Sequence, residues 1–494
     1  MSLVRKCALL ASALASATLL FAAVATELVA VTPRPTSSRL ALQPCRVPGV
    51  KEEARCGVYQ VYENRQSRQG RMLPLKVILL PAKNPHPADG PIFYMAGGPG
   101  EAATELTELI ADFGDTEEHD VVLVDERGTG EGHNLDCPSR GSDNDLERYL
   151  DGPFNPAAAR ACRDQLAQQF DLTQYSTPNF VDDIDEIRGA MGYSKINLSA
   201  GSFGTYTAMT YMRRHPDHVR TAYLSSLVPL SNRVPLYHAE AAQRGLDELL
   251  TECDEDTACH AAYPQVRENF TALMKKVHAA PVLTTVRHPV TGAPTKIHLS
   301  ERAFADAVRV MLYRVPSAHE IPFLIQQAVA GDFSPFAEAA LRANRGIYTG
   351  ASLGLNYAIT CNEFVSRIRP EDVGPATNES FLGAWRVRDQ MAACEGWPKT
   401  ELPADYFQPF QLAAPAVLVS GEADGTGPNG MWGKKVAWYM PNAVHVIVPG
   451  AAHTPEIDCT RTIRHALFRT GTTKGLDTGC IGKVARPAFK MPTG

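Results

Sequence analysis

The sequence predicts an α/β fold in which a mostly parallel, doubly wound sheet is interrupted by a mainly helical insertion. Three observations lead to this prediction. In the first part of the chain, short apolar runs alternate with amphipathic helical segments, which is the pattern of a parallel sheet. A long middle region then carries apolar residues at helical spacing and has few strand-like runs. Strand signals resume near the C-terminus.

The strand-like runs of the first part follow one another in a regular order. Residues 57–62 and 75–80 are predicted to form a hairpin around a polar turn. Residues 91–96 and 121–124 are compact apolar runs of the kind that fill buried parallel strands. Residues 219–224 supply a further strand. These runs predict the first part of the sheet.

The segment Lys195–Tyr206 contains the most informative motif, and a helix predicted over residues 182–191 leads into it. A short apolar run ends in a turn of small residues with Ser202 at its apex, and a helical pattern follows. A strand, a sharp turn and a helix that together expose one hydroxyl group are typical of the nucleophile elbow of α/β-hydrolases. Ala200 replaces the first glycine of the G-x-S-x-G pattern, and Gly204 keeps the second. We therefore expect the α/β-hydrolase fold with an inserted, mainly helical cap.

Two polar residues follow strand-like runs near the C-terminus. Asp424 comes after the run at residues 416–420, and His453 comes after the run at residues 444–448. Serine, aspartate and histidine in this chain order, each at the carboxyl end of a strand, are typical of α/β-hydrolases. We predict that Ser202 is the nucleophile, that His453 is its general base, and that Asp424 orients the imidazole.

A glycine-rich loop, Gly97–Gly100, follows the strand predicted at residues 91–96. Such a loop lets backbone amides approach a ligand closely, although taken alone it would be read as a simple turn. We predict that the amides of Phe203 and of Gly98 or its neighbour form the oxyanion hole. Asp125 and Arg127, which follow the next strand, are predicted to form a structural ion pair that braces these loops.

The N-terminus has the pattern of a signal peptide over residues 1–25. Two basic residues precede the apolar stretch Cys7–Val24, and Ala23-Val24-Ala25 supplies a small-residue cleavage site. A retained anchor is the alternative. Residues 26–40 are predicted to be a polar linker, and no other stretch approaches the roughly 20 apolar residues that a membrane span requires. We expect a secreted or periplasmic protein without a membrane span after signal removal.

Ten cysteines lie outside the predicted signal peptide. An even number of cysteines in an exported chain favours disulfides. The alternative, a metal site, has no support from a C-x-x-C or H-E-x-x-H motif, so we expect neither a metal nor a cofactor. The sequence alone leaves the connectivity open, and the simplest pairing is sequential: Cys45–Cys56, Cys137–Cys162, Cys253–Cys259, Cys361–Cys394 and Cys459–Cys480.

The length of the chain bears on its domain organisation, and its charge bears on the class of partner. A chain of 494 residues exceeds one ordinary core. We predict that residues 41–228 and 406–494 form the two parts of the sheet domain and that residues 229–405 form the helical cap. The formal net charge is −6 and no long basic run occurs, which argues against nucleic acid as a partner.

The chain resembles the exported tripeptidyl aminopeptidases and their proline iminopeptidase-like relatives, which are α/β-hydrolase serine peptidases. The resemblance implies release of short peptides or single residues from a free N-terminus, with the triad on Ser202, Asp424 and His453. Two departures concern substrate preference: Ala96 stands where the iminopeptidases usually have histidine, and Gly425–Pro428 replaces a proline-rich stretch. The resemblance covers nearly the whole mature chain and rests on Gly97–Gly100, Asp125–Gly130, Asn197–Thr205, Ser420–Asp424, His453 and Gly475–Cys480.

An aminopeptidase also needs a carboxylate that binds the ammonium group of its substrate. Glu363, in Cys361-Asn362-Glu363 of the predicted cap, is the first candidate, since relatives often carry Cys-x-Glu at this point. Glu101, directly after the glycine-rich loop, is the second. For each of them, a solvated or salt-bridged glutamate is the alternative.

Three functions remain open at this point. The favoured one is an exported aminopeptidase that releases tripeptides or other short units from peptides with free N-termini through an acyl-enzyme. An esterase or amidase acting on small molecules is the alternative, because the same triad serves both chemistries. A non-catalytic binding protein is the third, but it would be favoured by loss of a triad residue, and none is lost.

Overall fold

The structure is a computed structural model that describes residues 40–131, 133–137, 141–150, 152, 154–427 and 429–492. All of them belong to the unit Arg39–Gly494. The predicted signal peptide, and all but the last residue of the predicted linker, lie outside the described residues. No helix within the described part of the chain is long and apolar enough to cross a membrane.

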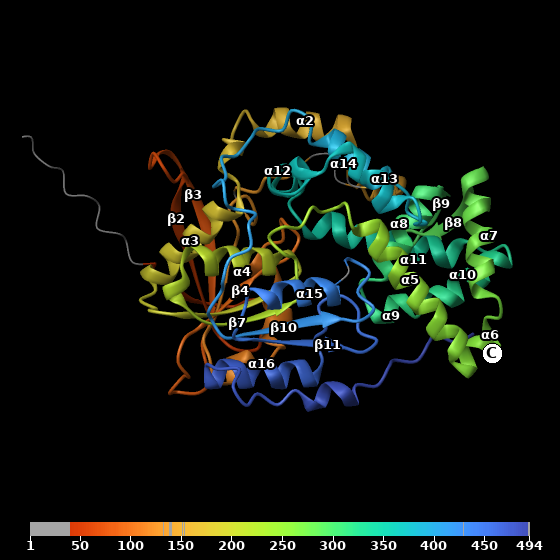
Figure 1. Ribbon diagram of the computed structural model, residues 1–494. Coiled ribbons are helices and arrows are strands. Elements are labelled where there is room, and N and C mark those ends of the chain that lie inside the picture. The colour runs from red at the N-terminus through yellow and green to blue at the C-terminus, as the bar shows by residue number, and fades with distance from the viewer. Residues whose placement is uncertain are drawn as a thin grey trace, which may run out of the picture. The chain divides into compact units, whose positions relative to one another are not determined.

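A nine-stranded sheet forms the centre of the described chain (Figure 1). Strands β1, β2 and β3 lie at one edge as antiparallel neighbours, and β3 pairs antiparallel with β5. From β5 to β11 all neighbours are parallel. This is the predicted mostly parallel sheet, and its order is β1 (Gln43–Cys45), β2 (Ala54–Asn64), β3 (Gln69–Leu80), β5 (Val121–Val124), β4 (Ile92–Met95), β6 (Ile196–Gly201), β7 (Val219–Ser225), β10 (Ala416–Gly421) and β11 (Ala443–Val448).

Helices cover both faces of this sheet, and each face has its own hydrophobic core. One core contains side chains of α3 (Thr177–Ala190), α4 (Phe203–Arg214) and α15 (Asn429–Trp438). The other contains side chains of α1 (Thr107–Ala111) and α16 (Asp458–Thr470). Figure 1 shows α16 and α4 on opposite sides of the strands. The α/β-hydrolase fold class predicted from the sequence is confirmed.

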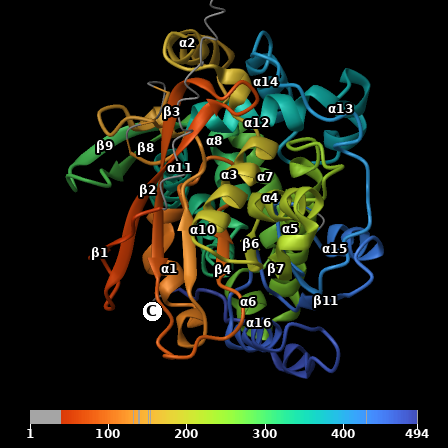
Figure 2. The ribbon, with the colours of Figure 1, turned by 90° about the vertical axis from the view of Figure 1, so that its left-hand side faces the viewer.

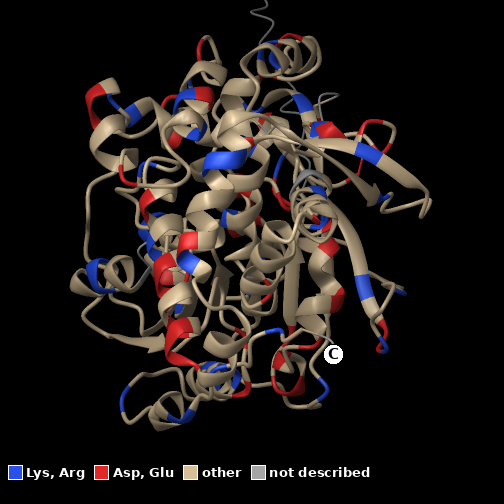
Figure 3. Cartoon of the chain, turned by 90° about the vertical axis from the view of Figure 1, so that its right-hand side faces the viewer, with Lys and Arg blue, Asp and Glu red and all other residues tan. Residues whose placement is uncertain are grey.

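A third hydrophobic core joins the helices of the middle region. Its side chains come from several helices and from a small antiparallel pair of strands, β8 (Val282–Arg287) and β9 (Pro294–Leu299). Acidic and basic residues are interspersed on the side of the molecule that Figure 3 shows, which is the right-hand side of Figure 1. The helices are α5 (His238–Glu255), α6 (Thr257–Ala262), α7 (Val266–Ala279), α8 (Glu301–Met311), α9 (Val315–Ala318), α10 (Ile321–Val329) and α11 (Ser334–Gly350).

The last helices of the predicted cap pack differently. Buried side chains of α12 (Leu353–Glu363), α13 (Pro370–Thr377) and α14 (Trp385–Ala393) belong to the core that covers one face of the sheet. Helix α2 (Pro156–Leu166), from the first part of the chain, contacts α12 and α14, and Figure 2 shows α2 close to α14. Most buried side chains of these three helices therefore join the core of the sheet, although Leu382, between α13 and α14, belongs to the third core.

Five disulfides join the pairs that the simplest sequential pairing gives. They are Cys45–Cys56, Cys137–Cys162, Cys253–Cys259, Cys361–Cys394 and Cys459–Cys480, with sequence separations from 6 to 33 residues. Loops of this size stabilise a fold by roughly 2–4 kcal/mol each, mainly by restricting the unfolded chain.

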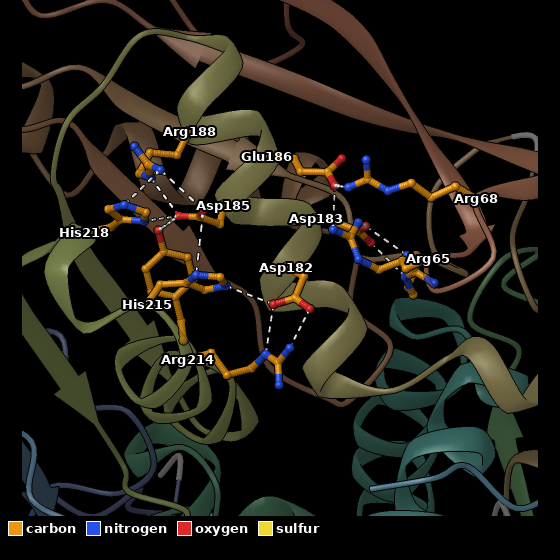
Figure 4. Close-up of polar contacts among 12 residues, drawn as sticks. Arg65, Arg68, Asp182, Asp183, Asp185, Glu186, Arg188, Arg214, His215 and His218 are labelled. Atoms are coloured by element: carbon orange, nitrogen blue, oxygen red, sulfur yellow. Dashed lines mark hydrogen bonds and ion pairs between the residues drawn. The ribbon is translucent and has the colours of Figure 1, made fainter. Parts of the chain in front are cut away.

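Buried ion pairs fix helix α3 to the strands (Figure 4). Arg127 and Asp183 are both 0% exposed, and their Nε–Oδ2 distance is 2.7 Å. Arg65, from the turn between β2 and β3, pairs with the same carboxylate. The prediction that Arg127 pairs with Asp125 is wrong: Asp125 accepts hydrogen bonds from the amide and hydroxyl of Thr104 (2.8 and 2.9 Å), while the Arg127 side chain reaches α3.

Candidate active site

Ser202 lies at the sharp turn between β6 and α4, as the elbow motif predicts. Its backbone is in a left-handed conformation with φ +56°, and its amide donates a hydrogen bond to the carbonyl of Ser225. The second glycine of the motif is required by space, because a Cβ on Gly204 would lie 2.1 Å from the carbonyl oxygen of Met95. Ala200 is accommodated as a buried residue of β6.

Asp424 and His453 meet at the carboxyl ends of β10 and β11. The Asp424 side chain is 0% exposed, and its Oδ2 lies 2.8 Å from Nδ1 of His453. The other oxygen, Oδ1, accepts hydrogen bonds from the amide and the hydroxyl of Thr426 (2.9 and 2.7 Å). Burial alone would raise the pKa of Asp424, but His453 and Thr426 hold it below its ordinary value. Asp424 is therefore kept as a carboxylate beside the imidazole.

Ser226, a residue that the sequence analysis missed, connects these loops. It is buried, has φ +56°, and donates a hydrogen bond from its hydroxyl to Oδ2 of Asp424 (2.8 Å). The hydroxyl oxygen of Ser226 in turn accepts a hydrogen bond from the amide of Thr454 (2.7 Å), next to His453. Ser226 thus fixes the acid and the base relative to each other. The only feature of the sequence that points to Ser226 is its position shortly after the strand predicted at residues 219–224.

Arg244, on α5, binds the loop that carries Asp424. Its guanidinium donates hydrogen bonds to the carbonyl oxygens of Glu422, Asp424 and Gly427, at 3.2, 2.8 and 3.1 Å. These three carbonyls span the turn that carries the carboxylate. The first helix of the middle region therefore contributes directly to the geometry of the candidate site.

Ser202 and His453 line one cavity of about 700 Å³. The predicted oxyanion residues Gly98 and Phe203 line the same cavity, and residues of α8, α9 and α11 close it from the side of the middle region. The ring of Tyr313 lies 5.4 Å from that of His453, and its carbonyl accepts a hydrogen bond from the His453 amide. The structure thus places Ser202, His453 and the two predicted oxyanion residues around one space, and Asp424 contacts His453 from outside the lining.

The glycine-rich loop is held in place by helix α12. The amide of Ser352 donates a hydrogen bond to the carbonyl of Gly100 (2.8 Å), and Nδ2 of Asn356 donates to the carbonyl of Pro99 (3.0 Å). Gly98 has φ +105°, a conformation that favours glycine. Phe203 is the first residue of α4, where the helix dipole favours negative charge. An oxyanion hole formed by Gly98 and Phe203 stays a prediction.

The two candidates for binding a substrate ammonium group have different surroundings. Glu363 is 0% exposed and lies outside the cavity lining, with its oxygens accepting hydrogen bonds from the amide of Thr177 (2.8 Å) and the hydroxyl of Tyr406 (3.0 Å). The expectation that Glu363 faces the cleft is therefore wrong, because the end of α12 turns into the core. Glu101 lines the cavity and is only partly buried.

A second buried carboxyl group lies near Glu363. Glu126 is buried, and its Oε1 has no hydrogen-bond partner among the described residues. Burial and the neighbouring Glu363 raise the pKa of Glu126 to about 8. In the unfolded chain the pKa of the same group is near its ordinary value of 4.5. The stability that this shift provides is complete below pH 4.5 and is lost as the pH rises to about 8.

We expect the Glu126→Gln variant to have a higher melting temperature than the wild type at pH 8.5. The amide of glutamine cannot ionise. We therefore expect the free energy of unfolding to rise by about 2–4 kcal/mol at pH 8.5 and by less than about 1 kcal/mol at pH 4.5. Calorimetric scans of both proteins at the two pH values measure this. An equal shift at both values would show that Glu126 does not titrate between them.

One group of side chains among the described residues has the composition and spacing of a metal site. Asp185, His215 and His218 bring their ligand atoms within 4.8 Å of one another (Figure 4). However, the Asp185 carboxylate already accepts hydrogen bonds from Nε of Arg188 (2.8 Å), from the hydroxyl of Tyr211 (2.9 Å) and from Nδ1 of His218 (2.6 Å). The guanidinium would repel a cation, so the group serves as a hydrogen-bonded brace between α3 and the end of α4.

Comparisons with known proteins agree with this architecture. A family model described as alpha/beta hydrolase fold matches residues 90–254, and a model described as TAP-like protein matches residues 379–480. The chain is 29% identical over 174 residues to a tripeptidyl aminopeptidase of Streptomyces lividans, a match that covers 31% of each protein. It is 26% identical over 239 residues to serine protease Hip1 of Mycobacterium tuberculosis, covering 44% of this chain and 45% of that protein.

The matches span 31% of the Streptomyces protein and 45% of the Mycobacterium protein, less than half of either relative. Among solved structures, proline iminopeptidase of Mycobacterium smegmatis superposes with a TM-score of 0.40 and 16% identity, covering 84% of this chain and 98% of the other. The sheet order, the serine at the elbow and the two family models all agree. The chain has the α/β-hydrolase fold and is similar to the tripeptidyl aminopeptidase and the serine protease named above.

Proposed function

We propose that this protein is a serine aminopeptidase that releases tripeptides or other short units from free peptide N-termini through an acyl-enzyme. The observation that carries the proposal is the hydrogen bond of 2.8 Å between Asp424 and His453, at a cavity that Ser202 also lines. The similarity to a tripeptidyl aminopeptidase and to a serine protease, together with the match to the TAP-like family model, supports a peptide as the substrate.

In the proposed reaction, Nε2 of His453 accepts the proton of Ser202 as Oγ attacks the carbonyl carbon. Asp424 accepts a hydrogen bond from Nδ1–H of His453, without taking the proton, and so keeps the tautomer in which Nε2 is free to act as a base. The C–N bond then breaks, and His453 passes the proton to the leaving amine. Water hydrolyses the acyl-enzyme by the same route in reverse. The amides of Phe203 and Gly98 would stabilise the oxyanion in both halves.

We also propose that the protein acts outside the cytoplasm. Five disulfides within one chain are typical of proteins that fold in an oxidising compartment. The signal-peptide pattern of residues 1–25 supports the same location.

A panel of chromogenic substrates tests the proposed function. It contains a free tripeptidyl arylamide, its N-acetylated twin and a short acyl ester, with the Ser202→Ala variant as the matched control. Hydrolysis of the free peptide that is lost on acetylation and in the variant supports the proposal. If only the ester is cleaved, or acetylation makes no difference, the esterase alternative replaces it.

A further inference from the structure

Glu101 lies close to the nucleophile. A Cβ placed on Gly97 would be 2.9 Å from Oε2 of Glu101 and 3.5 Å from Cβ of Ser202. These two atoms are therefore at most roughly 6.5 Å apart, which is less than the length of two extended residues. The carboxylate stands beside the position where the attacked carbonyl group of a substrate has to lie.

The two oxygens of Glu101 have different surroundings. Oε2 accepts a hydrogen bond from the amide of Gly97 (3.0 Å), which fixes the side chain against the glycine-rich loop. Oε1 accepts no hydrogen bond from any residue that the structure describes, and the side chain lines the cavity. Glu101 forms no ion pair within 4.0 Å in the described chain. One oxygen of a fixed carboxylate is thus available to a cationic group in the cavity.

The distance from the nucleophile limits which ammonium group can reach this oxygen. The amino nitrogen of a residue lies about 2.5 Å from its own carbonyl carbon, and each preceding residue of an extended chain adds about 3.3–3.6 Å. The N-terminus of a bound tripeptidyl group therefore lies about 9–10 Å from the attacked carbon. The N-terminus of a single aminoacyl group, about 2.5 Å from the attacked carbon, is therefore the one that a carboxylate within roughly 6.5 Å of Ser202 can reach.

We propose that Glu101 binds the α-ammonium group of the residue whose carbonyl Ser202 attacks, so that the enzyme releases single N-terminal amino acids. This inference rests on the proposed aminopeptidase function and specifies the length of the released unit. The cavity beyond Glu101 then holds the side chain of that residue and the start of the leaving peptide. Glu101 is a substrate-binding residue in this scheme, and the triad does the bond making and breaking.

Two measurements test the inference. The first follows digestion of a twelve-residue peptide by the wild-type protein with mass spectrometry, where single-residue losses are expected instead of losses of three. The second compares kcat/KM of the wild type, Glu101→Gln and Glu320→Gln on aminoacyl, dipeptidyl and tripeptidyl arylamides and on their N-acetylated twins. Glu320 also lines the cavity, but it pairs with Lys490 (3.2 Å) on the side of the middle region.

Glu101→Gln is expected to lower kcat/KM for the free aminoacyl substrate by about 10- to 100-fold, mainly through KM, because a charge-assisted hydrogen bond is lost. Glu320→Gln should leave this value unchanged, and the slow cleavage of acetylated substrates should not respond to either change. Release of tripeptides, or full activity of Glu101→Gln on the aminoacyl substrate, overturns the inference while leaving an aminopeptidase. Hydrolysis of esters alone, dependent on Ser202, refutes the proposed function itself.

Should Glu101→Gln fail to fold, the digestion pattern of the wild type still shows whether single residues or longer units are released. Glu101→Asp supplies a second variant, because it keeps the charge but withdraws the carboxylate by one methylene group. It is expected to recover part of the activity that Glu101→Gln loses. Equal activity of the two variants on the aminoacyl substrate would contradict a direct contact with the ammonium group.

Discussion

The Asp424→Asn variant is expected to lose about 10⁴-fold in kcat with an unchanged fold. Two donors of Thr426, its amide and its hydroxyl, point at Oδ1 of Asp424. They would hold the carbonyl oxygen of an asparagine at that position and turn its NH₂ group toward His453. The NH₂ group would then donate a hydrogen bond to Nδ1, so the imidazole carries its proton on Nε2. His453 in this tautomer cannot accept the proton of Ser202.

Ser226→Ala is expected to lower kcat less than Asp424→Asn does. It removes one of the two hydrogen bonds to Oδ2 and leaves the one from His453. We therefore expect a loss of only about 3- to 30-fold in kcat, which corresponds to about one hydrogen bond. Steady-state kinetics and circular dichroism of both variants check the two expectations. If Asp424→Asn kept more than a tenth of the wild-type kcat, another residue would have to orient His453.

Asp183→Asn is expected to lower the free energy of unfolding by about 3–5 kcal/mol. The change leaves the buried guanidinium of Arg127 facing a neutral amide, although that guanidinium also donates hydrogen bonds to the carbonyls of Glu63 (2.9 Å) and Gln174 (3.0 Å). An uncompensated buried charge is costly because water cannot reach it. Urea denaturation of the variant and the wild type measures the difference.

Glu186→Gln is the matched control for this experiment. Glu186 lies on the same helix and its carboxylate pairs with Arg65 (2.7 Å) and Arg68 (3.5 Å), but 35% of its side chain is exposed (Figure 4). We expect a loss of less than about 1 kcal/mol, since water screens the pair. Similar losses for the two variants would show that burial of Asp183 does not set its contribution.

The sequence contained the information for the sheet and for the elbow because both follow from local patterns. The run at residues 121–124 is apolar and bounded by turns, and it becomes strand β5 with the same limits. The place of Ser202 follows from small residues that a sharp turn requires. Asp424 and His453 could be predicted to lie near each other because a parallel sheet brings the carboxyl ends of its strands together.

The remaining features depend on contacts between distant segments. Ser226 has no motif of its own, and its role is visible only when β7 and β10 are neighbours. Glu363 was misplaced because its helix packs into the core of the sheet instead of facing the cleft. The acids of residues 182–185 look like helix-start residues, but α3 begins earlier and uses them in ion pairs.

The short spans of the disulfides bear on how this chain can fold. Each bond closes a loop of at most 33 residues, and no loop overlaps another. Closing a short loop costs less chain entropy than joining distant cysteines. Every native pair can therefore form within its own segment of the chain, and oxidation of neighbouring cysteines in chain order gives the native set without reshuffling.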